Sequence, residues 1–222
     1  MYDLRDAVIG WHLRPAKGHL NHGDPTQIFI GKTITPHGIQ NTCVSACSYG
    51  LHAAETILGA VAMGPGPLLS KVILLPLAFQ HPPTTPNQVV CPCTRIQSHG
   101  SGLYKKYVAA KRIHMWDLDI SPELMELSKW ILLTTITPAL HDQIKSIRTA
   151  KQLSSCYRKC RDMVLGKYVT TVGYPWLNSV HYNTVFSVHS RIVKGLRYNA
   201  KLVEKANSKL ESLVRKRMGI EF

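Results

Sequence analysis

The sequence predicts an α+β fold: a small N-terminal part that is mostly β-strand with one helix, followed by a helical C-terminal part. Three observations favour this class. Glycine-punctuated segments of β-prone residues fill the first half, a helix start stands at residue 121, and residues 196–218 repeat apolar side chains at steps of three, four or seven. With 222 residues, 45% of them hydrophobic, the chain can bury a core. We place an α+β domain carrying the CSYGLHA motif at residues 1–118 and a basic helical region at residues 119–222, leaving open whether the two pack as one domain.

Alternation, length and punctuation predict the N-terminal elements. Residues 26–34, TQIFIGKTI, alternate as in a strand. Residues 52–63, HAAETILGAVAM, have the length and alanine content of a short helix, which the GPGP of residues 64–67 ends. Residues 68–79 are rich in Leu, Val and Ile and predict a buried strand, and residues 103–119 predict another strand with aromatic bulk.

A helix start opens the second half. Ser121 fits an N-cap, Pro122 the first helical position and Glu123 the first turn. We expect the helical part to continue over residues 138–169 after a kink at Pro138. The apolar residues of the first helix share one face: Leu124, Leu127, Ile131 and Leu132.

The charge is strongly positive and unevenly distributed. The formal net charge is +14, and residues 143–222 hold 16 Lys and Arg against 4 Asp and Glu, a net of +12. Such an excess favours an anionic partner: nucleic acid, a nucleotide or an acidic host protein. The alternative is a basic protein that has no such partner. Basic side chains at helical spacing can track a phosphate backbone or form a solvated face. The nucleic-acid-binding candidates are Lys201, Lys205, Lys209, Arg215, Lys216 and Arg217.

Two cysteine pairs are candidate zinc ligands. Cys43 and Cys47 form C-x3-C, and Cys91 and Cys93 form C-x-C. Four thiolates could close a tetrahedral zinc site, with His52 as an alternative fourth ligand. The cofactor is otherwise unknown, and zinc is the possibility that these cysteines raise. The other interpretation is small buried thiols, because cysteine is often a packing residue.

Familiar nucleotide and hydrolase motifs are missing from the sequence. It has no G-x-x-x-x-G-K-[ST], no G-x-G-x-x-G and no G-x-S-x-G. Eleven histidines include no H-E-x-x-H pair. These absences argue against the P-loop, dinucleotide-fold, α/β-hydrolase and zinc-peptidase classes.

Several short motifs follow one another along the chain. They are WHLRP at 11–15, IGKTI at 30–34, CSYGLHAA at 47–54, GPGPLLSKVIL at 64–74 and YVAAKRIHMWDLD at 107–119. In this order they resemble a family of uncharacterised phage and prophage-like bacterial proteins with a Cys-x-x-Gly-Leu-His-Ala motif. Ala54 stands where that family often has Ser or Cys. The resemblance implies a phage-encoded protein with an accessory role.

Two functions follow as hypotheses. The first is a non-catalytic accessory protein that binds a host or anti-phage defence component, or nucleic acid, through a basic surface. The second is a nucleotide-binding or ADP-ribosyltransferase-like enzyme, because the strand and helix order of the N-terminal part is loosely similar to those folds. That similarity implies that an Arg or His of the first strand holds NAD, with Glu55 as the nearby glutamate. With the basic pair beside Trp116 added, the ligand-binding candidates are His12, Arg14, His52, Lys111 and Arg112.

The sequence predicts a protein of the host cell cytoplasm with no membrane partner. No run reaches the roughly 18 to 20 apolar residues that span a bilayer, and no basic segment followed by an apolar one opens the chain. The amphipathic last helix leaves homodimerisation open.

Overall fold

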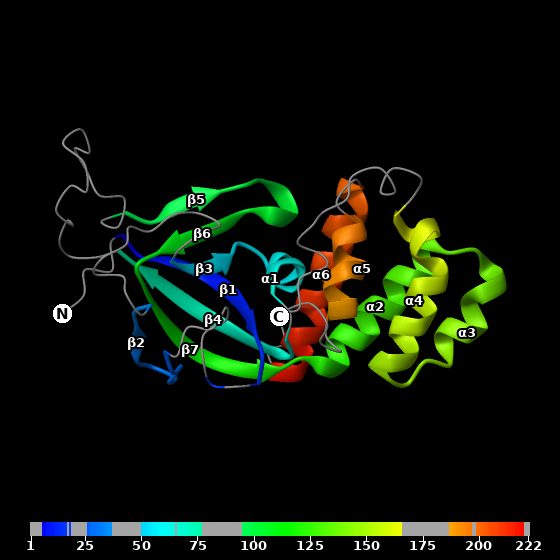
Figure 1. Ribbon diagram of the computed structural model, residues 1–222, viewed down its shortest axis with the longest axis horizontal. Helices are drawn as coiled ribbons and strands as arrows, with labels where there is room; N and C mark the ends of the chain where they lie inside the picture. Colours follow the sequence, from blue (N-terminus) through cyan, green and yellow to red (C-terminus); the bar gives the residue numbers. More distant parts are fainter. Residues whose placement is uncertain are drawn as a thin grey trace.

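The computed structural model describes residues 6–16, 18, 26–36, 50–64, 66–76, 95–165, 187–196 and 199–219. Its strands are β1 (Val8–Arg14), β2 (Thr33–Ile34), β3 (Leu51–Ala54), β4 (Leu68–Leu75), β5 (Gln97–His99), β6 (Lys106–Ala109) and β7 (Lys111–Asp119). They form one seven-stranded sheet in the order β2-β7-β4-β1-β3-β6-β5, and every neighbouring pair of strands is antiparallel (Figure 1).

The predicted fold class is wrong in the size and reach of its β part. We expected a small, mostly-β N-terminal part, but the strands form one half-barrel sheet that extends from Val8 to Asp119. The reason is long-range pairing. β1 pairs with β4 along its whole length, and β4 pairs along its whole length with β7. Such partners lie tens of residues apart in the chain, so local patterns do not reveal them.

The sheet curls because two strands that follow each other directly in the chain lie on opposite sides of its central strands. Only Ala110 separates β6 from β7, yet β3, β1 and β4 lie between these two strands in the sheet. Figure 1 shows β6 and β7 diverging from a shared corner, with the three other strands between them. Apolar side chains of β3, β4 and β6 meet inside this curl. They are Ala53, Val72, Leu74 and Ala109.

The helices cover the other face of the sheet and extend away from it. They are α1 (Ile57–Met63), α2 (Ser121–Thr135), α3 (His141–Lys145), α4 (Ala150–Leu165), α5 (Ser187–Gly195) and α6 (Ala200–Met218). α1 lies on β1 and β3, and α5 and α6 pack on α1 and on α2 (Figure 1). The main core joins Leu13 and Leu69 of the sheet to helix residues such as Leu58 and Leu210. Whether residues 1–118 and 119–222 form one domain or two stays a prediction.

The alanine-rich segment of residues 52–63 is only partly helical. Residues 51–54 form β3, and the helix begins at Ile57. The alanines have another cause. A Cβ added at Gly10 of β1 would lie 2.8 Å from the Ala53 Cβ and 2.9 Å from the oxygen of the next residue. Small side chains are therefore needed where β1 and β3 approach closely.

The strand predicted over residues 26–34 is also wrong. Gly31 has a φ of 74°, in the left-handed region that favours glycine, and it turns the chain. Only Thr33 and Ile34 then pair with β7. The predicted buried strand at 68–79 is confirmed as β4 within the described residues, and the single strand predicted at 103–119 is divided into β6 and β7.

The helix predicted from residue 121 is confirmed, and its predicted apolar face is buried. The N-cap predicted at Ser121 is wrong, because Ile120 is the N-cap and Ser121 is the first helical residue. The Ser121 N–H donates to Asp119 Oδ1 at 2.8 Å just before the helix. The continuous helix predicted over residues 138–169 is wrong, since the helix is interrupted between the end of α3 and the start of α4. Thr149 and Gln152 exchange side-chain and backbone hydrogen bonds there, a capping box that starts a new helix.

Among the described residues, none of the helices combines the length and the apolar composition that a membrane crossing requires.

Candidate functional site

Polar side chains from three neighbouring strands gather on the inner face of the curled sheet. In β1 and β4, His12 lies opposite Ser70, and in β4 and β7, Ser70 lies opposite Asp117. Directly opposed residues of an antiparallel pair point to the same face. Strand alternation adds Arg14 beside His12. We call the following set the inner polar cluster: His12, Arg14, Ser70, Arg112, His114, Asp117 and the backbone carbonyl of His52.

A β-bulge in β7 brings Asp117 into the inner polar cluster. Val72 of β4 lies opposite His114, but the preceding Lys71 lies opposite Trp116, so Met115 is an extra residue. Asp117 lies three positions after His114 in the chain, a spacing that would place the two on opposite faces of a regular strand. The bulge restores them to the same face.

Asp117 is the carboxylate of the inner polar cluster. It accepts hydrogen bonds from the Arg14 guanidinium and the Ser70 hydroxyl, and His114 Nδ1 lies 3.8 Å from its Oδ1. Burial raises the pKa of Asp117, but the contact with His114 and the hydrogen bonds from Arg14 and Ser70 together hold it below its usual range. The group is therefore a stable anion at neutral pH.

Arg112 spans the inside of the curl. It is only 1% exposed, and its Nη1 donates to the backbone oxygen of His52 on β3 at 2.7 Å. Its Nε has no hydrogen-bond partner among the described residues. Burial and the charge of Arg14 together lower the pKa of Arg112 to about 9, although Asp117 opposes the shift. The guanidinium still carries its charge at neutral pH, so it is a buried cation that can offer further donors to a ligand.

Two histidines complete the inner polar cluster as neutral groups. The rings of His12 and His114 meet edge to face, with centroids 5.5 Å apart. Burial and the charge of Arg112 hold the pKa of His12 well below its usual range. Burial likewise lowers the pKa of His114 to about 4, although Asp117 opposes the shift. Within the described part of the chain, His12 Nδ1 and both ring nitrogens of His114 are without a hydrogen-bond partner.

The structure brings four of the five ligand-binding candidates together. His12, Arg14 and Arg112 belong to the inner polar cluster, and His52 supplies its carbonyl and lies near enough to affect the pKa of His12. Lys111 precedes Arg112 on β7, so strand alternation places it on the opposite face.

Glu55 takes part in a separate, exposed cluster at the end of β3. Its Oε1 accepts hydrogen bonds from Lys105 at 2.5 Å and from the Tyr107 hydroxyl at 3.0 Å. The Lys105 bond lowers the pKa of Glu55. The carboxylate is thus occupied by its own neighbours.

The zinc prediction stays untested. Cys43, Cys47, Cys91 and Cys93 lie outside the described residues. In the parts of the chain that are described, no three His, Cys, Asp or Glu side chains are grouped so as to hold a metal ion.

The nucleic-acid-binding candidates lie on α6. Lys201, Lys205 and the residues of the last turn are exposed, whereas Lys209 is half-buried and pairs with Glu126 at 3.1 Å. The last-turn residues Arg215, Lys216 and Arg217 also complement the helix dipole, which is their structural role.

Sequence reasoning missed Ser70, His114 and Asp117. A usable signal existed for one of them. Arg112 and His114 stand two residues apart in a predicted strand, and such residues share a face. The bulge that adds Asp117 and the pairing that adds Ser70 leave no comparable trace in the sequence.

No family model, no curated protein and no solved structure matches this chain.

Proposed function

We propose that the inner polar cluster binds a phosphate-bearing small molecule of the nucleotide class. The observation that carries the proposal is Arg112, a buried guanidinium whose hydrogen bond within the described residues goes to a neutral carbonyl. A buried charge is costly unless an opposite charge and hydrogen bonds compensate it. A phosphate oxygen would supply both.

The neighbouring groups favour the same ligand chemistry. The cluster holds two guanidinium groups and one carboxylate, so it has an excess of positive charge. Neutral His12 and His114 can donate hydrogen bonds to an anion without adding charge. Arginine also matches phosphate geometry with paired donors.

Binding is better supported than ADP-ribosyl transfer. A transferase needs a glutamate beside the bound NAD, but Glu55 is exposed and bonded to Lys105 and Tyr107. We therefore propose nucleotide binding without a transfer reaction.

Isothermal titration with NAD, ADP-ribose and ATP tests the nucleotide proposal. We expect at least one of the three to bind, and Arg112→Gln to weaken it about tenfold or more, because a charge-assisted hydrogen bond is removed. Lys111→Gln is the matched control, since it removes the same charge from the other face of β7 and should change the affinity less than about twofold. If Arg112→Gln does not fold, His114→Gln replaces it. Equal losses in variant and control, or no binding by the unaltered protein, would contradict the proposal.

The second candidate function is binding of nucleic acid, or of an acidic host protein, through the exposed basic side chains of α6. Exposed Lys201 and Lys205 lie one helical turn apart. An accessory role in phage-infected cells, in the host cytoplasm, belongs to this candidate and rests on the motif order. Homodimerisation through α6 has less support, because Ala206, Leu210 and Val214 of its apolar face are already buried within the chain.

Salt dependence tests the second candidate. Affinity for a labelled DNA duplex should fall steeply with salt. Lys201→Gln with Lys205→Gln should reduce the slope of log K against log salt by about 0.9 for each phosphate that the protein no longer neutralises. The control removes the exposed Lys32 and Lys151 instead and should leave the slope unchanged. A slope that is insensitive to the α6 substitutions would exclude this surface.

A further inference from the structure

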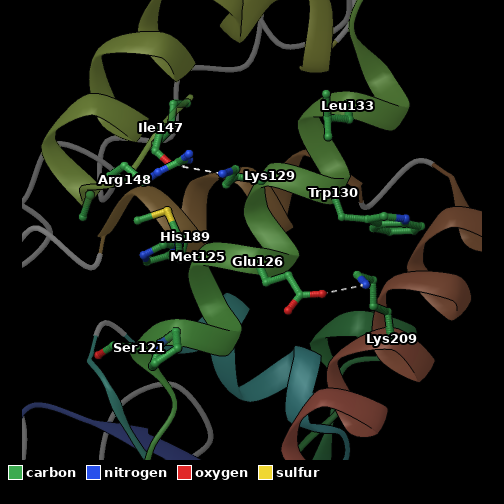
Figure 2. A pocket seen from close by; sticks show the side chains of 12 residues that line it. Ser121, Met125, Glu126, Lys129, Trp130, Leu133, Ile147, Arg148, His189 and Lys209 are labelled. Atoms are coloured by element: carbon green, nitrogen blue, oxygen red, sulfur yellow. Dashed lines mark hydrogen bonds and ion pairs between the residues drawn. The ribbon is translucent and has the colours of Figure 1, made fainter. Parts of the chain in front are cut away.

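A hollow of about 770 Å³ lies over the outward face of α2, far from the inner polar cluster. Residues of α2, of the link between α3 and α4, of α5 and of α6 line it. Figure 2 shows Ile147 and Arg148 on one side of α2, and Trp130 and Lys209 on the other. The hollow thus extends across the helix rather than into the core.

The lining of this hollow contains apolar side chains that the core covers only in part. Met125, Trp130 and Leu133 are half-buried, and each packs against the main core with one side. Ile147 adds a buried apolar residue next to Lys129 and Arg148 (Figure 2). Covering an apolar surface of this kind with a partner removes it from water, which favours binding.

Two cations are held together at one edge of the hollow. Lys129 Nζ donates to the backbone oxygens of Lys145 and Ile147 at 2.9 and 3.0 Å. Arg148 Nη1 donates to the same two oxygens at 2.7 and 3.2 Å. These bonds cap the C-terminal end of α3, which is the structural role of both side chains. They also fix two like charges close together on shared neutral acceptors.

The charges around the hollow do not balance. Glu126 is paired with Lys209 at 3.1 Å, so its charge is already compensated. His189 is neutral at physiological pH, because burial lowers its pKa to about 4. No ion pair joins Lys129 or Arg148 to a carboxylate within the described residues. The hollow therefore presents a fixed pair of positive charges next to apolar side chains.

We propose that this hollow docks an acidic peptide segment of a partner protein, with a carboxylate at the Lys129–Arg148 pair and an apolar side chain against Met125. Charge complementarity and the apolar lining together favour this occupant. Nucleic acid fits less well, because phosphates gain nothing from Met125 and Leu133. The proposal does not depend on the nucleotide site, which lies on the other face of the sheet.

Peptide selection on the full chain tests the docking site. Random peptides displayed on phage are selected against the intact protein, and the enriched sequences are synthesised with a fluorescent label. We expect them to combine Asp or Glu with large apolar residues. In anisotropy titrations, Lys129→Gln with Arg148→Gln should weaken binding about tenfold or more. Met125→Gln should weaken it as well.

The control is Lys151→Gln, which removes an exposed charge near the hollow but not in its lining. Circular dichroism melts establish that each variant is folded, and Met125→Gln keeps the test decisive if the double variant is not. Enriched peptides without acidic residues, or binding unchanged in both lining variants, would overturn the proposal. A third outcome would also overturn it: the lining variants abolish binding of a DNA oligonucleotide but leave peptide binding unchanged. Nucleic acid would then be the occupant of the hollow.

Discussion

Replacing Asp117 by alanine is expected to lower the free energy of unfolding by about 3–5 kcal/mol, the usual range when one partner of a buried ion pair is removed. Asp117 accepts hydrogen bonds from Arg14 and Ser70, and Ser70 is fully buried. The substitution removes the carboxylate from the inner polar cluster, which also contains the buried Arg112. The inner face of the sheet then holds two guanidinium groups without the anion that faces them.

A second substitution separates charge from shape. Asp117→Asn keeps an acceptor for Ser70 or Arg14 but removes the negative charge, so it should cost less than alanine and still destabilise clearly. Urea denaturation followed by fluorescence measures both. The matched control is Asp142→Ala, because that side chain is fully exposed and pairs with Lys145 only at 3.5 Å. It should leave the urea midpoint unchanged within the error of the measurement.

A loss below about 1 kcal/mol for Asp117→Ala would show that water or a rearranged side chain replaces the carboxylate at little cost. The inner polar cluster would then be solvated in the free protein. Arg112 would then be hydrated and would not need a phosphate, which would contradict the nucleotide proposal.

The sequence predicts part of the candidate site because strand alternation is a local property. The loose similarity to ADP-ribosyltransferase folds named His12 and Arg14. Both lie in the inner polar cluster, because residues two positions apart in a strand share a face. The same rule applied to Arg112 identifies His114. Asp117 escapes it because a bulge changes the count, and a bulge depends on how β4 pairs with β7 rather than on the residues of β7 alone.

The fold was predictable where the residues at the end of a helix determine where the helix begins or ends. The start of α2 follows from Pro122 and Glu123 in its first turn, and the end of α1 follows from Gly64. The half-barrel was not predictable in this way, because β1 must find β4 across the whole of α1 and the preceding residues. Ala53 illustrates the difficulty: its small size favours a helix locally, whereas its actual role is to let β1 pass at Gly10.

Gly66→Ala is expected to lower the free energy of unfolding by about 3 kcal/mol or more. Gly66 lies directly on the end of β1. A Cβ there would overlap the carbonyl group of Arg14 and lie 2.6 Å from the Pro15 nitrogen. These are backbone atoms at the end of a fully paired strand, so they cannot rotate away as a side chain would. The strand end would have to move, and Arg14 would move away from Asp117 with it.

Urea denaturation of Gly66→Ala beside Gly18→Ala measures this effect. Gly18 is the matched control, because a Cβ there would meet nothing within 4 Å and its φ lies outside the left-handed region. The control should stay within about 0.5 kcal/mol of the unaltered protein. If Gly66→Ala is equally mild, the end of β1 yields easily. The sheet would then not hold Arg14 in place against Asp117. The inner polar cluster would not be preformed, and its residues would take their final positions only when the ligand binds.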